Sequence, residues 1–394
     1  MPVLNCVPEE GKHGCGPDAH VPGGQVCHQD KKISMNRKGI MKMGWKKEHF
    51  GTMESGAVIS KYTLTNENGV SASFTDLGGT WLTMVVPDKD GQMADVLLGY
   101  ETPEDIRTKS GHLGEIVGRN ANRIGGASFT LNGVTYALVI NSGSRNNLHS
   151  GPDFYRDRLW DAQVEETGLG TRITFSLFSP DGDQNYPGNA NIAVSYTLTP
   201  DNSLRLDYLM TADEDTIANF TNHAYFNLAG HDAGSVLGQK VWIDADTFTI
   251  TDAESIPTGE LVSVKGTPMD FTQLKTIGDE IDADYEPLKQ AGGYDHNWAL
   301  NHEAGDLALS CKAVDEASGR VMEVYTDLPG VQFYTANGLR GQIGKGGALY
   351  DPRYGYCFET QYFPDAINKP QFASPVVKAG EEYKTTTIYH FTVL

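Results

Sequence analysis

From residue 50 onward, β-branched and aromatic residues recur with polar residues between them over short stretches of the chain. This pattern, in which side chains alternate with a period of two, is typical of β-strands with one buried face. Turn signals such as Asn132-Gly133 separate the stretches, and that pair predicts a hairpin within residues 124–138. Helical periodicity is confined to residues 103–108 and 272–281. The strands predicted in this way include 57–65, 70–75, 127–131, 134–138, 172–176, 193–199 and 203–211.

These strands are too many for a small barrel, and no internal repeat is visible. We therefore predict an all-β fold, a large antiparallel β-sandwich. The 394 residues are 39% hydrophobic and 21% charged, which is enough apolar material for such a core. Length alone leaves the number of domains open.

The first part of the chain lacks this pattern. Residues 1–43 are rich in Gly, Pro, His and Lys, and we interpret them as a flexible extension ahead of a catalytic domain at 44–394. Their cysteine and histidine spacing matches no zinc motif, and the five cysteines of the chain do not indicate a disulfide framework. The basic cluster at 31–47 is compatible with a targeting sequence, with a later start at Met35 or Met41, or with a solvated tail.

The charge of the chain is unevenly distributed. Its net charge is -20, and because residues 1–48 hold 8 basic and 5 acidic side chains, the remainder holds 23 basic and 46 acidic ones. A negative field repels phosphate backbones and anionic lipids, which argues against nucleic acid and membranes as partners. No apolar run is long enough for a signal peptide or a membrane span, so we expect a cytoplasmic protein, as a monomer or weak homodimer.

Residues 219–228 have a polar and an apolar face if they form a strand. The polar face would carry a row of amide, hydroxyl, imidazole and phenol groups, which is typical of a polar ligand cleft. A structural strand with a hydrogen-bonded histidine would show the same pattern. The polar face is Asn219, Thr221, His223, Tyr225 and Asn227, and the apolar face is Phe220, Ala224, Phe226 and Leu228.

A carboxylate stands in an aromatic, β-prone run near the C-terminus. Residues 356–363 place Glu359 and Gln361 on one strand face. A buried carboxylate is costly unless it is hydrogen-bonded, paired or functional, so both a structural ion pair and a catalytic group are open here. Gln332 has similar apolar surroundings within residues 330–337.

Three further clusters, at 118–124, 146–149 and 293–298, are rich in Asn, Arg, Asp and His. Amides, carboxylates and arginines pair with adjacent sugar hydroxyls, although any one of these clusters could be a turn. The chain has no G-x4-G-K-[ST], G-x-G-x-x-G, H-E-x-x-H or G-x-S-x-G motif. The sequence therefore predicts no cofactor, and it predicts no metal site in the body of the chain.

Taken together, these clusters resemble the motifs of the aldose 1-epimerase (galactose mutarotase) family. The resemblance implies a single large β-sandwich domain with an open cleft and a cofactor-free isomerase that interconverts the α and β anomers of free hexoses such as galactose and glucose. Asn120, Ser150 and Ala224 depart from the family pattern and put the preferred sugar in doubt. From about residue 45 to 394 the motifs keep the family's order: 118–124, 146–149, 181–188, 219–230, 256–260, 293–297, 329–337 and 359–368.

The resemblance also implies a role for individual residues. Glu359 would be the general base and His223 the general acid, which fits a reaction that removes the C1 hydroxyl proton while protonating the ring oxygen. An anionic Glu359 would favour the imidazolium form of His223, so the two should titrate as a coupled pair. The remaining site residues implied are a second histidine, His149, and four that bind hydroxyls: Asn122, Arg123, Asp295 and Gln332.

Three alternatives remain. A hexose-6-phosphate 1-epimerase would need additional Arg or Lys at the cleft, which the acidic body disfavours. A carbohydrate-binding protein on the same fold would have no use for both Glu359 and His223. A glycosidase would use Asp295 and Glu359 as paired carboxylates.

Overall fold

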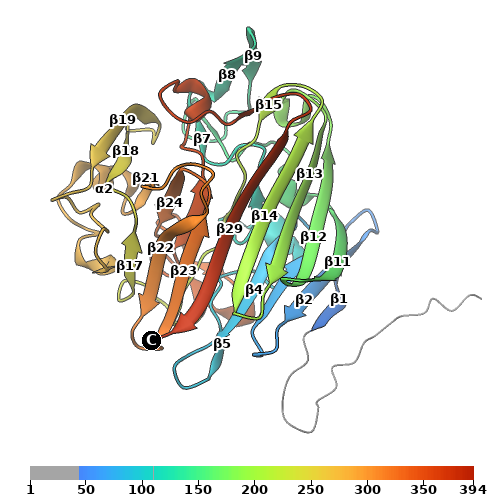
Figure 1. The fold of residues 1–394 in the computed structure, drawn as a ribbon, viewed down its shortest axis with the longest axis vertical. Helices are drawn as coiled ribbons and strands as arrows, with labels where there is room; N and C mark the ends of the chain where they lie inside the picture. The colour runs from blue at the N-terminus through green and yellow to red at the C-terminus, as the bar shows by residue number, and fades with distance from the viewer. Residues whose placement is uncertain (1–43, 110) are drawn as a thin grey trace, which may run out of the picture. The chain divides into compact units, whose positions relative to one another are not determined.

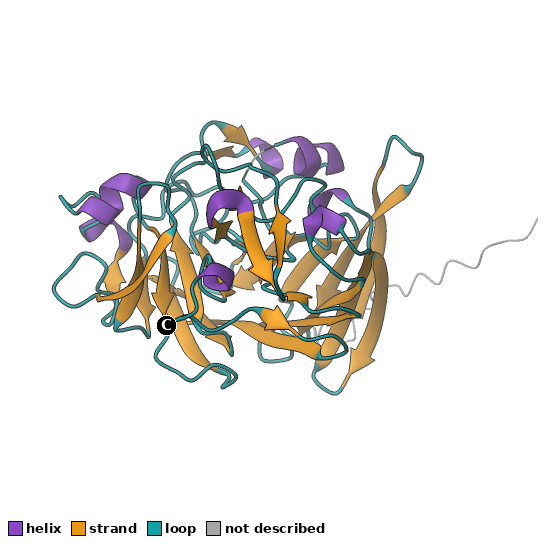
Figure 2. Cartoon of the chain, turned by 90° about the horizontal axis from the view of Figure 1, so that it is seen from above, coloured by secondary structure: helices purple, strands orange, loops and turns teal. Residues whose placement is uncertain are grey.

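The computed structural model describes residues 44–109 and 111–394, which consist largely of antiparallel β-strands with a few short helical turns (Figure 2). The predicted flexible extension at 1–43, including its cysteines and histidines, lies outside the described residues. Among the described helices, none combines the length and the hydropathy that a bilayer crossing requires.

The largest sheet has nine strands (Figure 1). Buried and partly exposed positions alternate along its central strands, because a period of two turns every second side chain toward the core. The last strand of the chain pairs on one side with residues 203–211 and on the other with residues 320–326, so the C-terminal segment completes the middle of the sheet. In spatial order the strands are β11 (Asp161–Thr167), β12 (Gly170–Ser179), β13 (Ala190–Leu198), β14 (Ser203–Ala212), β29 (Glu382–Val393), β23 (Arg320–Thr326), β22 (Ala308–Asp315), β17 (Lys240–Ile243) and β20 (Lys275–Thr276).

Two five-stranded sheets contribute to the same core as the nine-stranded sheet. The ring of Phe74 lies 4.4 Å from that of Tyr196, which joins the first of them to β13. The hydroxyl of Tyr389, on β29, donates to the carbonyl of Phe358 in the second, at 3.1 Å. The predicted antiparallel sandwich is thus confirmed. The two sheets are β1 (Gly44–Thr52), β2 (Val58–Thr65), β3 (Ser71–Thr75), β4 (Trp81–Pro87) and β5 (Met93–Asp95); and β19 (Pro257–Ser263), β18 (Thr247–Thr251), β21 (Asp295–Ala299), β24 (Gly330–Tyr334) and β27 (Cys357–Gln361).

Short elements connect these sheets. The predicted hairpin is confirmed, since β8 (Ser128–Leu131) and β9 (Val134–Ala137) pair across Asn132 and Gly133, both at positive φ. The helix predicted at 103–108 is also confirmed as α1 (Pro103–Thr108), with Thr102 as its N-cap. The other short elements are β6 (Ile116–Val117), β7 (Arg123–Ile124), β10 (Asn147–Leu148), β15 (Thr216–Ile217), β16 (Thr221–Asn222), α2 (Glu286–Ala291), β25 (Gln342–Ile343), β26 (Leu349–Tyr350) and β28 (Val376–Val377).

Two predicted elements are wrong. Residues 272–281 do not form a helix: they contain β20 and a single 3₁₀ turn, Ile277–Asp279, because the backbone of β20 pairs with β17 at the sheet edge. Residues 219–228 do not form one regular strand either, since β16 covers two residues and the rest makes isolated bridges to three other segments. The apolar side chains of this segment nevertheless lie in the main core, as the alternation predicted.

Candidate active site

The strands β21, β24 and β27 form the floor of a candidate active site. Their register places Asn297 opposite Gln332 and Gln332 opposite Glu359. Residues directly opposite one another in an antiparallel pair share a face, and so do residues two apart in a strand. Asp295, Gln332 and Glu359 therefore project from the same face of the sheet, although they are distant in the sequence.

Glu359 is a buried carboxyl with an open hydrogen-bonding position. Its side chain is 2% exposed, and its Oε2 atom has no hydrogen-bond partner among the described residues. Burial raises the pKa of Glu359 well above its ordinary value, Asp295 raises it further, and Arg123 opposes the rise. A carboxyl in such surroundings is suited to exchanging a proton with a bound ligand.

His223 lies directly beside this carboxyl. Its Nε2 atom is 3.7 Å from Oε1 of Glu359, and its Nδ1 atom is 3.5 Å from the sulfur of Cys357. Burial raises the pKa of the Cys357 thiol, which therefore keeps its proton and can donate it weakly to Nδ1. With Nδ1 as acceptor, the ring proton of His223 is on Nε2, on the side of Glu359.

Burial opposes charge on both members of the pair. It lowers the pKa of His223 to about 3, with a smaller contribution from His112, whereas it raises that of Glu359. In the empty pocket a proton shared by the two therefore resides preferentially on Glu359. The expectation of an imidazolium considered only the attraction between the two charges and omitted this desolvation.

His149 is held by backbone hydrogen bonds to Asn122. The amide of His149 donates to the carbonyl of Asn122 at 3.0 Å, and the amide of Asn122 donates to Nδ1 of His149 at 3.1 Å. Burial lowers the pKa of His149 well below its ordinary value, so the ring is neutral, and its proton is on Nε2 because Nδ1 accepts. His149 is therefore a hydrogen-bond donor.

Asp295 and Gln332 are joined before any ligand binds. Nε2 of Gln332 donates to Oδ1 of Asp295 at 2.7 Å, which orients the amide and leaves its Oε1 atom without a partner among the described residues. The Arg123 guanidinium is close enough to lower the pKa of both Glu359 and His149. A carboxylate, an amide oxygen and a guanidinium together offer both acceptors and donors to adjacent hydroxyls.

All seven predicted site residues line one pocket of about 220 Å³. Two of the other lining residues follow the predicted strand faces, since Tyr225 is two residues after His223 and Tyr334 is two after Gln332. His112 was not predicted, and its surroundings in the sequence contain no strand or motif signal. The lining residues not predicted are Gly111, His112, Leu148, Tyr225, Tyr334, Gly338 and Leu339.

A family model described as aldose 1-epimerase matches residues 60–390, which is most of the chain. The chain belongs to the aldose 1-epimerase family. It is 40% identical to a galactose mutarotase of Bos taurus over 347 residues, covering 87% of this chain and 97% of that protein. An aldose 1-epimerase of Escherichia coli is 35% identical over 331 residues, covering 84% of this chain and 94% of the bacterial one.

Solved structures show the same fold. A galactose 1-epimerase from Lactobacillus acidophilus superimposes with a TM-score of 0.78 at 25% identity, covering 89% of this chain and 99% of that one. An aldose epimerase homologue from C. elegans gives a TM-score of 0.75 at 26% identity, covering 90% of this chain and 100% of its own.

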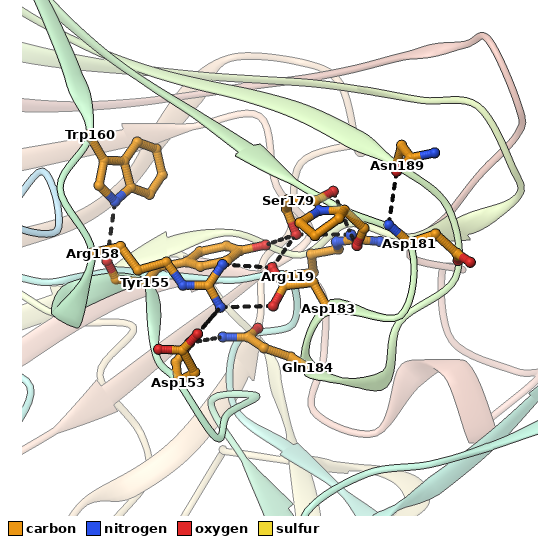
Figure 3. Close-up of polar contacts among 11 residues, drawn as sticks. Arg119, Asp153, Tyr155, Arg158, Trp160, Ser179, Asp181, Asp183, Gln184 and Asn189 are labelled. Atoms are coloured by element: carbon orange, nitrogen blue, oxygen red, sulfur yellow. Dashed lines mark hydrogen bonds and ion pairs between the residues drawn. The ribbon is translucent and has the colours of Figure 1, made fainter.

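Some polar residues of the epimerase motifs hold the structure together instead of lining the pocket. Arg119 is fully buried and donates to the carbonyl of Pro187 at 2.7 Å and to Oγ of Ser179 at 2.9 Å. Figure 3 shows that Tyr155 converges on the same serine, to which its hydroxyl donates. Arg119 thus anchors the segment that carries Arg123, four residues later.

The predicted polar face of residues 219–228 is not one continuous cleft. Asn219 accepts a hydrogen bond from the backbone amide of Tyr362, and Asn227 donates to the carbonyl of Gly234. These amides satisfy buried backbone groups, which is why the irregular segment can be buried. Of the five predicted polar positions, His223 and Tyr225 line the pocket.

Candidate ligand atoms of His149, His223 and Glu359 lie within 4.8 Å of one another, a donor set that could hold a metal ion. The Nδ1 lone pair of His149, however, accepts the amide hydrogen of Asn122, and its Nε2 is protonated in the neutral ring. The geometry therefore favours a hydroxyl group over a metal ion as the partner of His149 in this epimerase.

Proposed function

We propose that this protein is an aldose 1-epimerase that interconverts the α and β anomers of free hexoses such as galactose and glucose. The observation that carries the proposal is the pair of buried groups, Glu359 and His223, with 3.7 Å between them in a pocket lined by hydroxyl-binding side chains. The relatives named galactose mutarotase and aldose 1-epimerase support it.

The reaction requires two proton transfers at one acetal carbon. Glu359 accepts the proton of the C1 hydroxyl while His223 donates a proton to the ring oxygen, so that the bond from C1 to the ring oxygen breaks and C1 becomes an aldehyde. Rotation about the C1–C2 bond then presents the other face of the aldehyde. Closure reverses the transfers and returns the proton to His223. This sequence of steps needs no cofactor.

The other pocket residues orient the sugar in this proposal. Asp295 and Gln332 form a preassembled acceptor pair, and Arg123 and Asn122 complete the hydroxyl-binding wall. His149 donates from Nε2. Positioning of this kind can contribute several kcal/mol to the lowering of the barrier.

The proposal extends to the organisation of the protein. We assign catalysis to residues 44–394 as one domain, with residues 1–43 as an extension outside it, and the family match at 60–390 supports this division. We further propose a cytoplasmic protein that is a monomer or weak homodimer, a state in which one chain supplies every group named above.

Polarimetry tests the function directly. Fresh α-D-galactose and α-D-glucose should lose their excess optical rotation faster with the protein than in buffer, and equally fast with EDTA present. Catalysis confined to galactose 6-phosphate would instead indicate a hexose-6-phosphate epimerase, and release of methanol from a methyl galactoside would indicate a glycosidase. Sugar binding without faster mutarotation would leave only a carbohydrate-binding role.

A further inference from the structure

A third histidine, His112, lines the pocket together with His149 and His223. Its ring centroid lies 5.2 Å from that of His149 and 5.8 Å from that of His223, nearly parallel to the latter ring. Its side chain is 23% exposed, whereas those of the other two histidines are almost completely buried. His112 therefore occupies the more accessible side of the histidine cluster, where a ligand can reach it.

A buried ion pair holds this ring in place. Nδ1 of His112 is 2.7 Å from Oε2 of Glu115, whose other oxygen accepts from Arg156 at 2.9 Å. Burial alone would raise the pKa of Glu115, but His112 and Arg156 outweigh it and lower the pKa below its ordinary value. Glu115 is consequently an ionised carboxylate, which can only accept hydrogen bonds.

This arrangement determines the tautomer of His112. Because an ionised carboxylate has no proton to donate, the proton of the contact belongs to Nδ1 of His112. The neutral ring then has a free lone pair on Nε2. His149 has the opposite tautomer, with Nδ1 as acceptor and Nε2 as donor. Two adjacent histidines thus present an acceptor and a donor, which matches the two capacities of sugar hydroxyls.

The backbone at His112 has a φ of 57°, in the left-handed region that residues with side chains rarely adopt. Asn122 and His149, on the pocket wall, share this conformation, with φ values of 61° and 55°. Such conformations persist where the surrounding contacts impose them, and they concentrate at ligand-binding sites. At His112 the contact is the one with Glu115.

We propose that His112 is a specificity-determining residue of the epimerase pocket, whose Nε2 atom accepts a hydrogen bond from one hydroxyl of the sugar. Glu115 and Arg156 are positioning residues that act through it. The inference rests on the proposed function, because it concerns how the same pocket distinguishes one hexose from another.

A panel of deoxy sugars tests the contact. Mutarotation kinetics are compared for D-galactose and its 2-, 3-, 4- and 6-deoxy derivatives in wild type, His112→Asn and His112→Phe, with His302→Asn as the control outside the pocket. Asparagine tolerates the left-handed backbone, and phenylalanine keeps the ring but no nitrogen. We expect KM for galactose to rise about 3- to 10-fold in both variants, the range for one lost hydrogen bond, with kcat changed less than about 2-fold.

The decisive result is the coupling between variant and sugar. One deoxy derivative should have a comparably raised KM with wild type and the control but show no further rise with the His112 variants. If every deoxy derivative loses as much with the variants as with wild type, His112 contacts no hydroxyl and the inference is wrong. Wild-type mutarotation of galactose in the same series tests the proposed function separately.

The positioning role has a spectroscopic signature. Long-range ¹H–¹⁵N spectra of the wild type should show the His112 proton on Nδ1, and Glu115→Gln should reduce the population of that tautomer as well as raise KM, because an amide can also donate to Nδ1. A wild-type His112 with its proton on Nε2 would contradict the assignment. An unchanged tautomer in Glu115→Gln would remove Glu115 from the proposal.

Discussion

Replacement of Glu359 by glutamine should separate catalysis from folding. Glutamine keeps the size of the side chain but cannot accept the C1 hydroxyl proton. General-base catalysis typically contributes about 10²- to 10⁴-fold, which is about 3 to 5 kcal/mol of barrier, so kcat should fall by that factor while the sugar still binds. The position explains why the fold should tolerate it: Oε2 has no partner among the described residues, and the contact with His223 is 3.7 Å long.

Stability should move in the other direction, if at all. The pKa of Glu359 is raised in the folded protein, so the wild type is stabilised below the unfolded value and loses that contribution as pH rises through the folded value. A neutral amide avoids the loss, and the variant should be as stable as wild type at pH 7 or slightly more stable. Polarimetry, sugar titration by calorimetry and denaturant unfolding measure the three quantities.

The control is Glu260→Gln, an exposed glutamate on β19, which should match wild type in all three. If Glu359→Gln keeps more than about half of the wild-type kcat, where a base contributes at least about 10²-fold, another group accepts the proton. If kcat and stability fall together, the glutamate is structural and the reasoning from its open position is refuted.

His223→Asn should lower kcat by a similar 10²- to 10⁴-fold. Combined with Glu359→Gln it should be far less than multiplicatively worse, since both groups act in one exchange; multiplicative losses in polarimetry would contradict this. Arg123→Ala should mainly raise KM, and a fall in kcat alone would give it a different role. Burial lowers the pKa of His149, of His223 to about 3 and of His296 to about 4, so the unfolded chain binds more protons below about pH 6.5. Unfolding free energy should therefore decrease from pH 6.5 to 5.5, and in His223→Asn the decrease should be smaller by about 1 kcal/mol, which urea titrations at the two pH values can check.

The sequence predicted the floor of the site because strand parity carries the necessary information. Glu359 and Gln332 stand out as polar groups in runs of aromatic and β-branched residues, and in a strand every second residue shares a face. What the sequence could not show is the pairing of β21, β24 and β27, which brings the two together with Asp295. Register between strands is set by tertiary contacts across tens of residues.

Arg119 and Arg123 show where residue type ceases to be informative. Both belong to one motif, yet Arg119 is a fully buried anchor and Arg123 lines the pocket. The difference arises from partners in distant segments, such as Ser179. His112 escaped prediction for the same reason, because Arg156, which secures its carboxylate partner, lies in another loop.

The buried acid-base pair has a consequence for the direction in which the site stabilises the reaction. Ring opening moves one proton from His223 to the ring oxygen and another from the C1 hydroxyl to Glu359, so the open-chain complex contains a neutral imidazole and a neutral carboxyl. Burial favours this same distribution, since it lowers the pKa of His223 and raises that of Glu359. The cyclic complex, in contrast, requires both groups to be charged, and its carboxylate is stabilised by Arg123 and by the C1 hydroxyl. The pocket thus favours the open-chain aldehyde through which either anomer must pass, while the ion pair needed for closure is retained by contacts that only a bound sugar completes.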